Sequence, residues 1–376
     1  MRISSREWVL APLALAAAVA TMPAQAAADK VGMPSLYSTS SGPVANTGNT
    51  SAPSNWRLTA GSTFNGVAGA FDGTALLLFT ASGLSGTYAC SGSLMAGGQY
   101  VLTAGHCADG LLSMSIQFGF TAGTALETRS MVSYVQSPGW DGTLDTGADL
   151  ALIKLDAPVT NLPTYQLSTT NDVGKQILIT GYGTSGRGAG NQSPNWNDGD
   201  YGHYGYNTID TTSDQFEAAW DAYSGEGVYT APTYGHTYVS DFDSPTTTQY
   251  NTLQRISDLS GVNWANTTGE GTNEALIAGG DSGGGDFVWD GTRWVLTAVH
   301  SWGWQFCGGR IDSPTSCDSS TSNSSSYGDL SGSTAVYDHV AWINSVIGAV
   351  PEPGTYALMG LGLAIVGATS RRRRAA

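Results

Sequence analysis

The pentapeptide Gly-Asp-Ser-Gly-Gly at residues 280–284 places one serine, Ser282, among glycines. A serine hydroxyl is a weak nucleophile at neutral pH, so chemistry at this residue needs a base to take its proton and donors to hold an oxyanion. Glycines lack a Cβ, which lets the backbone turn the amides of Gly280 and Ser282 toward one point. We interpret this loop as a nucleophile with its oxyanion hole. The alternative is an ordinary turn, because the chain has 50 glycines.

A histidine and an aspartate elsewhere in the chain favour the first interpretation. His106 follows an apolar run at residues 100–104, and Asp149 precedes another at residues 150–155. An acid that opens a buried strand needs a polar partner, and the Nδ1–H group of an imidazole is a natural one. The sequence therefore contains the three side-chain types of a Ser-His-Asp hydrolase.

Composition indicates the kind of scaffold that positions these residues. The chain has 376 residues, many Gly, Tyr and Trp, and only 15 Lys and Arg together. Short apolar runs separated by Gly and Asn turns begin at Val67 and predict an all-β fold. The formal net charge of −15 argues against nucleic acid or an anionic membrane surface as a partner.

The N-terminus has the pattern of an exported protein. Arg2 and Arg6 precede an apolar run at residues 8–20, and Ala-Gln-Ala follows at residues 24–26. We predict a signal peptide over residues 1–26. Residues 27–66 are rich in Ser, Thr, Asn, Gly and Pro, which is typical of a linker or pro-segment.

Export makes a disulfide between Cys90 and Cys107 chemically reasonable. Closing this loop would stabilise the fold by roughly 3 kcal/mol in the chain-entropy description. It would also hold the neighbouring His106 in place.

The three motifs, taken together, resemble those of the chymotrypsin/trypsin-like (S1-type) serine proteases. They are Thr-Ala-Gly-His-Cys at residues 103–107, Asp-Leu-Ala-Leu at residues 149–152 and the Ser282 loop. The resemblance covers residues 67–348 and implies an all-β fold of two antiparallel Greek-key β-barrels with a short C-terminal helix. It implies that His106 is the general base and then the acid, that Asp149 orients it and that Ser282 attacks the scissile carbonyl. Asp145 is a rival for the acid, but only Asp149 precedes Leu-Ala-Leu.

A long insertion separates the second barrel's first strand from Ser282. We place the barrel boundary near residues 160–175 and the insertion at about 184–270. The insertion is aromatic and polar, and we expect it to form a pair of surface hairpins. We expect His203 and His236, which lie in it, to be surface residues because their spacing to cysteine does not fit a metal site.

An acidic pair in the insertion, Asp241 and Asp243, offers hard oxygen ligands. One hypothesis is a structural Ca²⁺ site, and the other is the solvated face of a strand. We expect no cofactor for catalysis.

The tripeptide Ser301-Trp302-Gly303 matches the strand that pairs with substrate in the resembling family, where the glycine leaves the primary pocket open. We expect the preceding His300 to be structural. Cys307 lacks its usual partner because position 278 is alanine, so we expect it to pair with Cys317.

Specificity follows from the residue six positions before the nucleophile, which is the pocket floor in the resembling family. Here it is Leu276, and we place Gly303 and Ala335 in the walls. An apolar floor favours cleavage after Leu, Met, Phe or Tyr. Glu274 would make the pocket trypsin-like if its carboxylate turned inward, but we expect it to be solvated.

Activation in the resembling family uses a newly cut N-terminus that pairs with the acid preceding the nucleophile, here Asp281. Val67 lies before His106 at about the distance that the resembling family shows. The residue directly before it is Gly66, not Lys or Arg. We predict a non-tryptic activating cut before Val67.

The C-terminal residues 349–376 form a separate segment. Pro-Glu-Pro precedes an apolar run at residues 356–368 and four arginines at 371–374, which resembles the PEP-CTERM sorting signal of exopolysaccharide-producing Gram-negative bacteria. This resemblance implies transient anchoring in the inner membrane, removal by a sorting machinery and release to the cell envelope or extracellular matrix. The alternative is a permanent anchor, but the run is short for a bilayer.

The sequence therefore predicts a secreted serine endopeptidase that acts on protein or peptide substrates through an acyl-enzyme. Two alternatives stay open: an esterase on the same scaffold, and a catalytically silent module that binds matrix.

Overall fold

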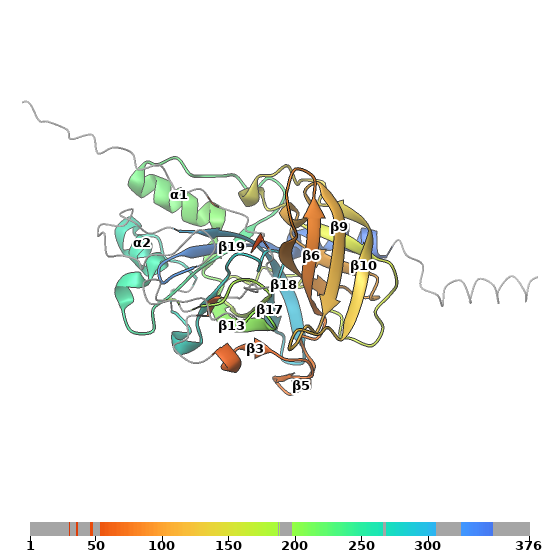
Figure 1. Cartoon of the computed structure of the whole chain (residues 1–376). Coiled ribbons are helices and arrows are strands. Elements are labelled where there is room, and N and C mark those ends of the chain that lie inside the picture. The colour runs from red at the N-terminus through yellow and green to blue at the C-terminus, as the bar shows by residue number, and fades with distance from the viewer. Residues whose placement is uncertain are drawn as a thin grey trace, which may run out of the picture.

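The computed structural model describes residues 30, 35–36, 46–47, 53–186, 188, 198–265, 268–305 and 325–348. Most of these residues lie in antiparallel strands, which are arranged in two large sheets side by side (Figure 1). No helix in these ranges is long and apolar enough to cross a membrane. The predicted all-β fold with a short C-terminal helix is confirmed.

The first sheet closes into a six-stranded barrel, drawn in orange and yellow in Figure 1. Its strand order is β7-β6-β9-β10-β11-β8, and β8 pairs back with β7. The strands are β6 (Thr74–Ala81), β7 (Tyr88–Leu94), β8 (Tyr100–Thr103), β9 (Leu111–Phe118), β10 (Glu127–Gln136) and β11 (Ala151–Leu155).

Burial along these strands follows their position in the barrel. The residues of β6 are buried almost throughout, as expected for a strand with neighbours on both faces. Partly buried and exposed positions largely alternate along β10, as expected where one face meets water. The barrel interior is filled by apolar side chains such as Leu77, Leu102, Ile116 and Leu152.

The second sheet has eight strands in the order β14-β15-β19-β18-β17-β12-β13-β3. Among the described pairings its edge strands β14 and β3 do not join, so the second of the two predicted barrels is an open sheet and only the first is closed there. The strands are β3 (Arg57–Leu58), β12 (Gln176–Gly181), β13 (Gly202–Thr208), β14 (Thr211–Thr212), β15 (Thr237–Asp241), β17 (Gly285–Trp289), β18 (Trp294–Trp304) and β19 (Leu330–Ala335).

The insertion does not form the expected pair of surface hairpins. It supplies β13, β14 and β15 to the second sheet, together with the helices α1 (Ser213–Ser224) and α2 (Thr252–Ser260). Helix α1 ends at Gly225, which has φ of 71°. Helix α2 begins after Asn251, whose side chain accepts the Gln254 amide. Some of the insertion's aromatic residues are core residues, as Phe216 and Trp220 show in their buried cluster with Trp302, whereas Tyr223, Tyr229 and Tyr234 are exposed.

The segment predicted to be a linker or pro-segment is folded from residue 53 onward. Strand β3 pairs with β13, and Trp56 and Leu58 are buried. A hairpin follows, formed by β4 (Thr63–Phe64) and β5 (Val67–Ala68). Further upstream, β1 (Ser35–Leu36) pairs with β7, and β2 (Asn46–Thr47) pairs with β16 (Ala275–Leu276). A loose linker therefore does not describe residues 53–66, whereas a packed pro-segment still does.

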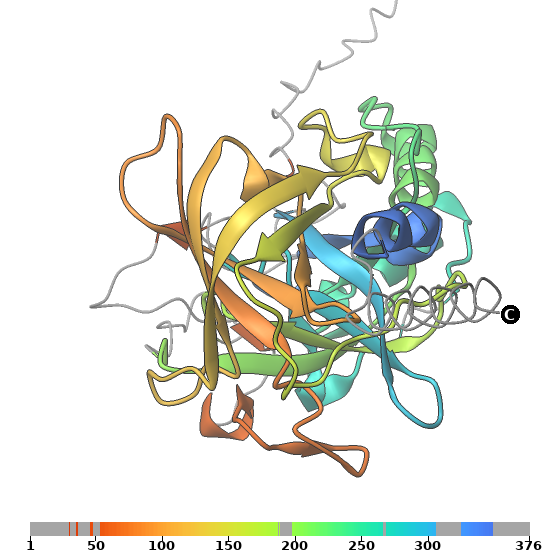
Figure 2. The same cartoon turned by 90° about the vertical axis from the view of Figure 1, so that its right-hand side faces the viewer.

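The C-terminal helix α3 (Val340–Ile347) packs into the main apolar core, which contains side chains from both sheets. Ile343 is fully buried in this cluster, together with Leu152 of β11 and Leu178 of β12. Figure 2 shows this helix in blue beside the barrel strands. It ties the two halves of the molecule together.

Candidate active site

His106 begins a short 3-10 helix, residues His106–Ala108, just after β8. Its Nδ1 lies 2.8 Å from Oδ2 of Asp149, and its backbone amide donates to Oδ1 of the same carboxylate at 2.9 Å. The carboxylate of Asp149 is an acceptor only, so Nδ1 carries the proton and Nε2 is left as the basic nitrogen. Nε2 of His106 has no hydrogen-bond partner among the described residues.

Asp149 is completely buried just before β11. In addition to its two bonds with His106, it accepts a hydrogen bond from the hydroxyl of Ser301 at 2.6 Å. Three donors thus hold one carboxylate, which satisfies a charge that burial alone would make costly. The rival acid, Asp145, does not contact His106 in the described contacts and forms an ion pair with Lys30 instead.

Ser282 lies in the turn before β17 and is nearly buried, with 2% of its surface exposed. Gly283 has φ of 81°, and a Cβ added to it would lie 2.0 Å from Oγ1 of Thr103. Only glycine fits both this backbone conformation and this contact. Gly280, with φ of 97°, shares the left-handed region. The Ser282 loop therefore packs directly against β8, the strand that leads to His106.

Ser91 of β7 also holds this loop. Its amide donates to the Ser282 carbonyl at 2.8 Å, and its hydroxyl donates to the Gly280 carbonyl at 3.0 Å. The Tyr182 amide in turn donates to the Ser91 hydroxyl. These bonds fix the peptide units that follow Gly280 and Ser282, next to the two amides that we assigned to the oxyanion hole. Sequence reasoning missed Ser91 because its partners are about 190 residues away.

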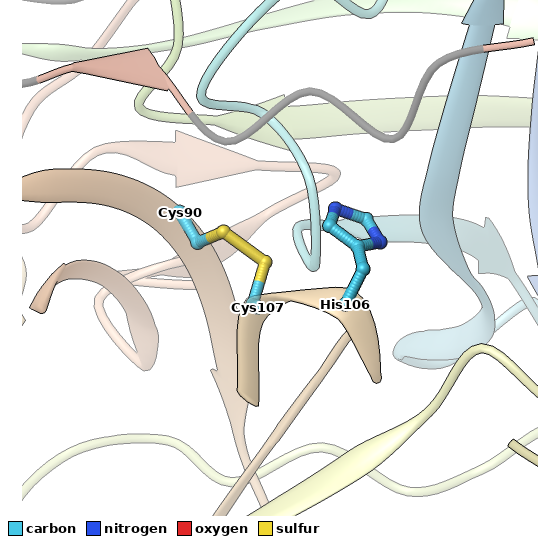
Figure 3. A group of neighbouring side chains, drawn as sticks. All are labelled: Cys90, His106 and Cys107. Carbon is cyan, nitrogen blue, oxygen red and sulfur yellow. A yellow bond between two sulfur atoms is a disulfide. The ribbon is translucent and has the colours of Figure 1, made fainter. Parts of the chain in front are cut away.

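The structure contains the predicted disulfide between Cys90 and Cys107 (Figure 3). Sγ of Cys107 lies 3.6 Å from the carbonyl oxygen of Ser282, so the disulfide touches both the His106 loop and the nucleophile loop. Cys90, His106 and Cys107 are also the one described cluster with metal-like spacing. Sulfurs joined in a disulfide are not thiolates, so this cluster does not fit a metal ion.

Trp140 is a site residue that the sequence did not reveal. Its ring centroid lies 6.5 Å from that of His106, and its Nε1 donates to Asp109. A Cβ on Gly105 would approach the Trp140 ring to 2.9 Å. The glycine in the histidine motif is therefore matched to this tryptophan.

The substrate-pairing strand lies within β18, where Ser301 and Trp302 are buried. Across the sheet, Gly303 pairs with Ser331 and Trp302 pairs with Gly332. Ala335, which we expected in the pocket wall, instead pairs with Ala298 inside the core of the second sheet. That prediction was wrong because counting back from residue 336 ignored how far β19 extends beyond the substrate strand.

Leu276, the predicted pocket floor, is buried against Phe242 and Tyr327. Glu274 is not solvated as expected, since only 1% of its surface is exposed. Its carboxylate accepts the amide of Glu270. Burial, reinforced by the charges of nearby acids, raises the pKa of Glu274 well above its usual range.

Asp281 and Val67, the predicted activation pair, have separate partners. The Asp281 carboxylate accepts the amides of Ala278 and Gly183 at 2.9 and 2.8 Å. Val67 pairs with Phe64 in an exposed hairpin. Burial raises the pKa of Asp281, against the opposing effects of His300 and the two amides.

The carboxylates of the proposed calcium pair are used within the protein. Asp241 accepts the Leu253 amide at the start of α2, and Asp243 accepts the side chain of Asn251. Burial raises the pKa of Asp241 to about 6, and burial with the Asp241 charge raises that of Asp243 to about 9. Oδ1 of Asp243 is buried without a hydrogen-bond partner among the described residues, and no metal-like cluster of three groups there includes this pair. The calcium site stays a prediction.

The histidines outside the site have defined partners. His203 is fully buried and bonds Asp198 at 2.9 Å, so its prediction as a surface residue was wrong. His236 is partly exposed beside Asp338. His300 is buried between the Asp281 carbonyl and the Asp286 carboxylate. Cys307, Cys317, the signal peptide and the C-terminal segment lie outside the described residues.

Two separate regions of the chain match known protein families. Residues 64–229 match the family model described as Trypsin, and residues 349–374 match the PEP-CTERM protein-sorting motif. The first match includes His106 and Asp149 and ends before Ser282. A solved structure of HL collagenase is similar at 19% identity, with a TM-score of 0.47, and the alignment covers 74% of this chain and 94% of the collagenase.

Proposed function

Because residues 64–229 match the family model described as Trypsin, we propose that the protein is an exported serine endopeptidase of the trypsin-like type. The observation that carries the proposal is the hydrogen-bonded pair of His106 and Asp149, with the Ser282 loop hydrogen-bonded to β7 beside it. We propose these three residues as the catalytic triad.

In the proposed reaction, Nε2 of His106 takes the proton of the Ser282 hydroxyl as the oxygen attacks the peptide carbonyl. Asp149 holds the imidazole in the required tautomer and stabilises its positive charge. The amides of Gly280 and Ser282 are proposed to stabilise the oxyanion. His106 then returns the proton to the leaving amine, and water hydrolyses the acyl-enzyme by the same route. This chemistry requires no cofactor.

For specificity we propose an apolar residue immediately before the cleaved bond. Support comes from Leu276 and its apolar neighbours Phe242 and Tyr327. Ser331, opposite Gly303, adds a small uncharged wall. Hydrolysis of a Phe or Leu anilide should be at least about tenfold faster than hydrolysis of the Arg anilide, because a buried unpaired cation is costly. The reverse order would point to Glu274.

We also propose an activating cut before Val67. The hairpin tip at residues 65–68 is exposed, which makes it accessible to a protease. Strand β3 would remain bound after the cut through Leu58 and the Arg57–Asp198 ion pair. Sequencing the N-termini of active enzyme should give both Val67 and an upstream fragment. An active form that still begins near residue 27 without a cut would contradict this activation.

The PEP-CTERM motif indicates export and sorting toward the cell envelope of a Gram-negative bacterium. We propose that this segment anchors the protein transiently in the inner membrane and is then removed by the sorting machinery. Mass spectrometry of the mature protein should show a C-terminus near residue 350.

A casein zymogram tests the proposed activity against its alternatives. The purified protein should clear casein, and the Ser282→Ala variant should not. Hydrolysis of p-nitrophenyl esters without casein cleavage would favour the esterase alternative. Loss of neither activity in Ser282→Ala would reject the proposed nucleophile.

A further inference from the structure

A buried cage of two acids and two tryptophans lies beside the proposed catalytic triad. Asp145 lies four residues before Asp149 in the sequence. Trp302 directly follows Ser301, whose hydroxyl donates to Asp149. Glu217 of α1 and Trp304 of β18 complete the group. We call these four residues the cation cage.

The cage holds a cation that belongs to the same chain. Nζ of Lys30 lies 2.6 Å from Oδ2 of Asp145 and contacts Oε1 of Glu217. The same Nζ lies 4.5 Å and 4.8 Å from the ring centroids of Trp302 and Trp304. Two carboxylates and two ring faces around one ammonium are a complete set of partners for a lysine side chain.

Burial makes the cage expensive to leave empty. Glu217 has no exposed side-chain surface, and Asp145 has 8%. Burial raises the pKa of Glu217 to about 7 although Lys30 opposes the shift, and the Asp145 charge adds to it. Two buried carboxylates repel each other, so an ammonium between them stabilises both.

Lys30 lies upstream of the proposed cut before Val67 and of the family match, which starts at residue 64. Both tryptophans of the cage lie on β18, the strand that we expect to pair with substrate. Because Gly303 on the same strand borders the primary pocket, a peptide paired there places the residues that lead up to the cleaved bond next to the cage.

We propose that the cation cage is a substrate subsite for a lysine side chain at a position before the apolar residue at the cleaved bond, and that Lys30 occupies it in the uncut chain. This inference rests on the proposed protease function and extends it. The long insertion thereby gains a role, since α1 supplies Glu217, the acid that the trypsin-like motifs do not predict.

The test uses the full chain with the Lys30→Met substitution, which leaves the cage free for substrate, and peptide anilides with Phe at the cleaved bond. Each substrate carries Lys or norleucine at the second, third or fourth residue before that bond. At one of these positions the Lys peptide should have a kcat/KM at least about tenfold higher than its norleucine partner, equal to about 1.4 kcal/mol. Equal rates at all three positions would overturn the proposal.

Variants identify the cage as the cause. Glu217→Gln should reduce the preference for Lys to about threefold or less, and Asp145→Asn provides a second variant if the first fails to fold. Asp258→Asn on α2 removes the same charge at an exposed site and should keep the preference. A preference that survives both cage variants would refute the assignment.

Binding separates this inference from the proposed function. In a Ser282→Ala, Lys30→Met double variant, calorimetry should show that the Lys peptide binds at least about tenfold more tightly than the norleucine peptide. If no anilide is cleaved, the proposed function fails, and this measurement still decides the cage. Equal affinity for the two peptides would overturn the cage even in an active enzyme.

Discussion

The two sheets supply different parts of the proposed active site and do so by different means. The first barrel provides His106 and Asp149 from strand ends joined by short connections, with the Cys90–Cys107 disulfide beside them. The second sheet provides Ser282 and the substrate strand, but its strands are separated by the insertion with α1 and α2. The base and the acid thus depend on local structure, whereas the nucleophile and the substrate subsites depend on contacts between distant segments.

This difference shows which contacts hold each part of the proposed site. Ser91 and Thr103 of the first barrel contact the Ser282 loop, whereas the helices between β13 and β16 do not supply these contacts. The insertion instead contributes Glu217, which shares the Lys30 ammonium with Trp302 of the proposed substrate strand.

The largest expected effect comes from the first barrel. Asp149→Asn should lower kcat by about 10⁴-fold, the loss typical of this change in a Ser-His-Asp triad, because the amide favours the wrong tautomer of His106. Circular dichroism should show an intact fold. Asp156 is an exposed aspartate that directly follows β11, so Asp156→Asn is the matched control and should retain activity. A loss below about tenfold in Asp149→Asn would mean that another acid orients His106.

The disulfide should be the next most important feature of that barrel. The Cys90→Ala, Cys107→Ala double variant should lose roughly 3 kcal/mol of unfolding free energy, measured by urea titration. Its kcat/KM should also fall, because Cys107 directly follows His106 and its Sγ contacts the Ser282 carbonyl oxygen. An unchanged urea midpoint would show that the disulfide does not constrain this region.

Ser301 of the second sheet donates a hydrogen bond to Asp149, so changing it tests the link between the two sheets. Ser301→Ala removes one of three donors to the Asp149 carboxylate and should lower kcat by about tenfold with a smaller change in KM. Ser113→Ala on β9, whose hydroxyl bonds Thr80 at the surface, is the control. If both variants behave alike, or if the Ser301 variant loses only substrate affinity, the second sheet does not position the acid.

Metal removal should have the smallest effect. Dialysis against EDTA should leave kcat/KM unchanged and shift Tm by less than about 1 °C, because the proposed chemistry uses no metal and because Asp241 and Asp243 accept hydrogen bonds from groups of the protein itself. Calcium-saturated EDTA is the control. A fall in Tm of about 5 °C that Ca²⁺ reverses would establish the structural calcium site that the sequence suggested.

The same division explains what the sequence could predict. His106, Asp149 and Ser282 stand in short motifs whose backbone needs are local, and the apolar runs around them predict strands. The β-fold and the Cys90–Cys107 disulfide followed from such local patterns.

Features that depend on distant segments could not be predicted in this way. His203 is buried because its side chain is hydrogen-bonded to Asp198. His203 and Arg57 lower the pKa of Asp198 to about 2, against the effect of burial. Ala335 was misplaced because strand register is set by pairing across the sheet. The contact of Lys30 with Glu217 spans 187 residues and leaves no periodic signal in the sequence.

The most direct test of the account is labelling with a fluorophosphonate followed by peptide mass spectrometry. Active protein should carry one phosphonyl group on Ser282, and the His106→Ala variant should react at least about a hundredfold more slowly because the base is missing. Equal labelling of both proteins, or labelling at a different serine, would contradict the claim that the first barrel activates a nucleophile held by the second sheet.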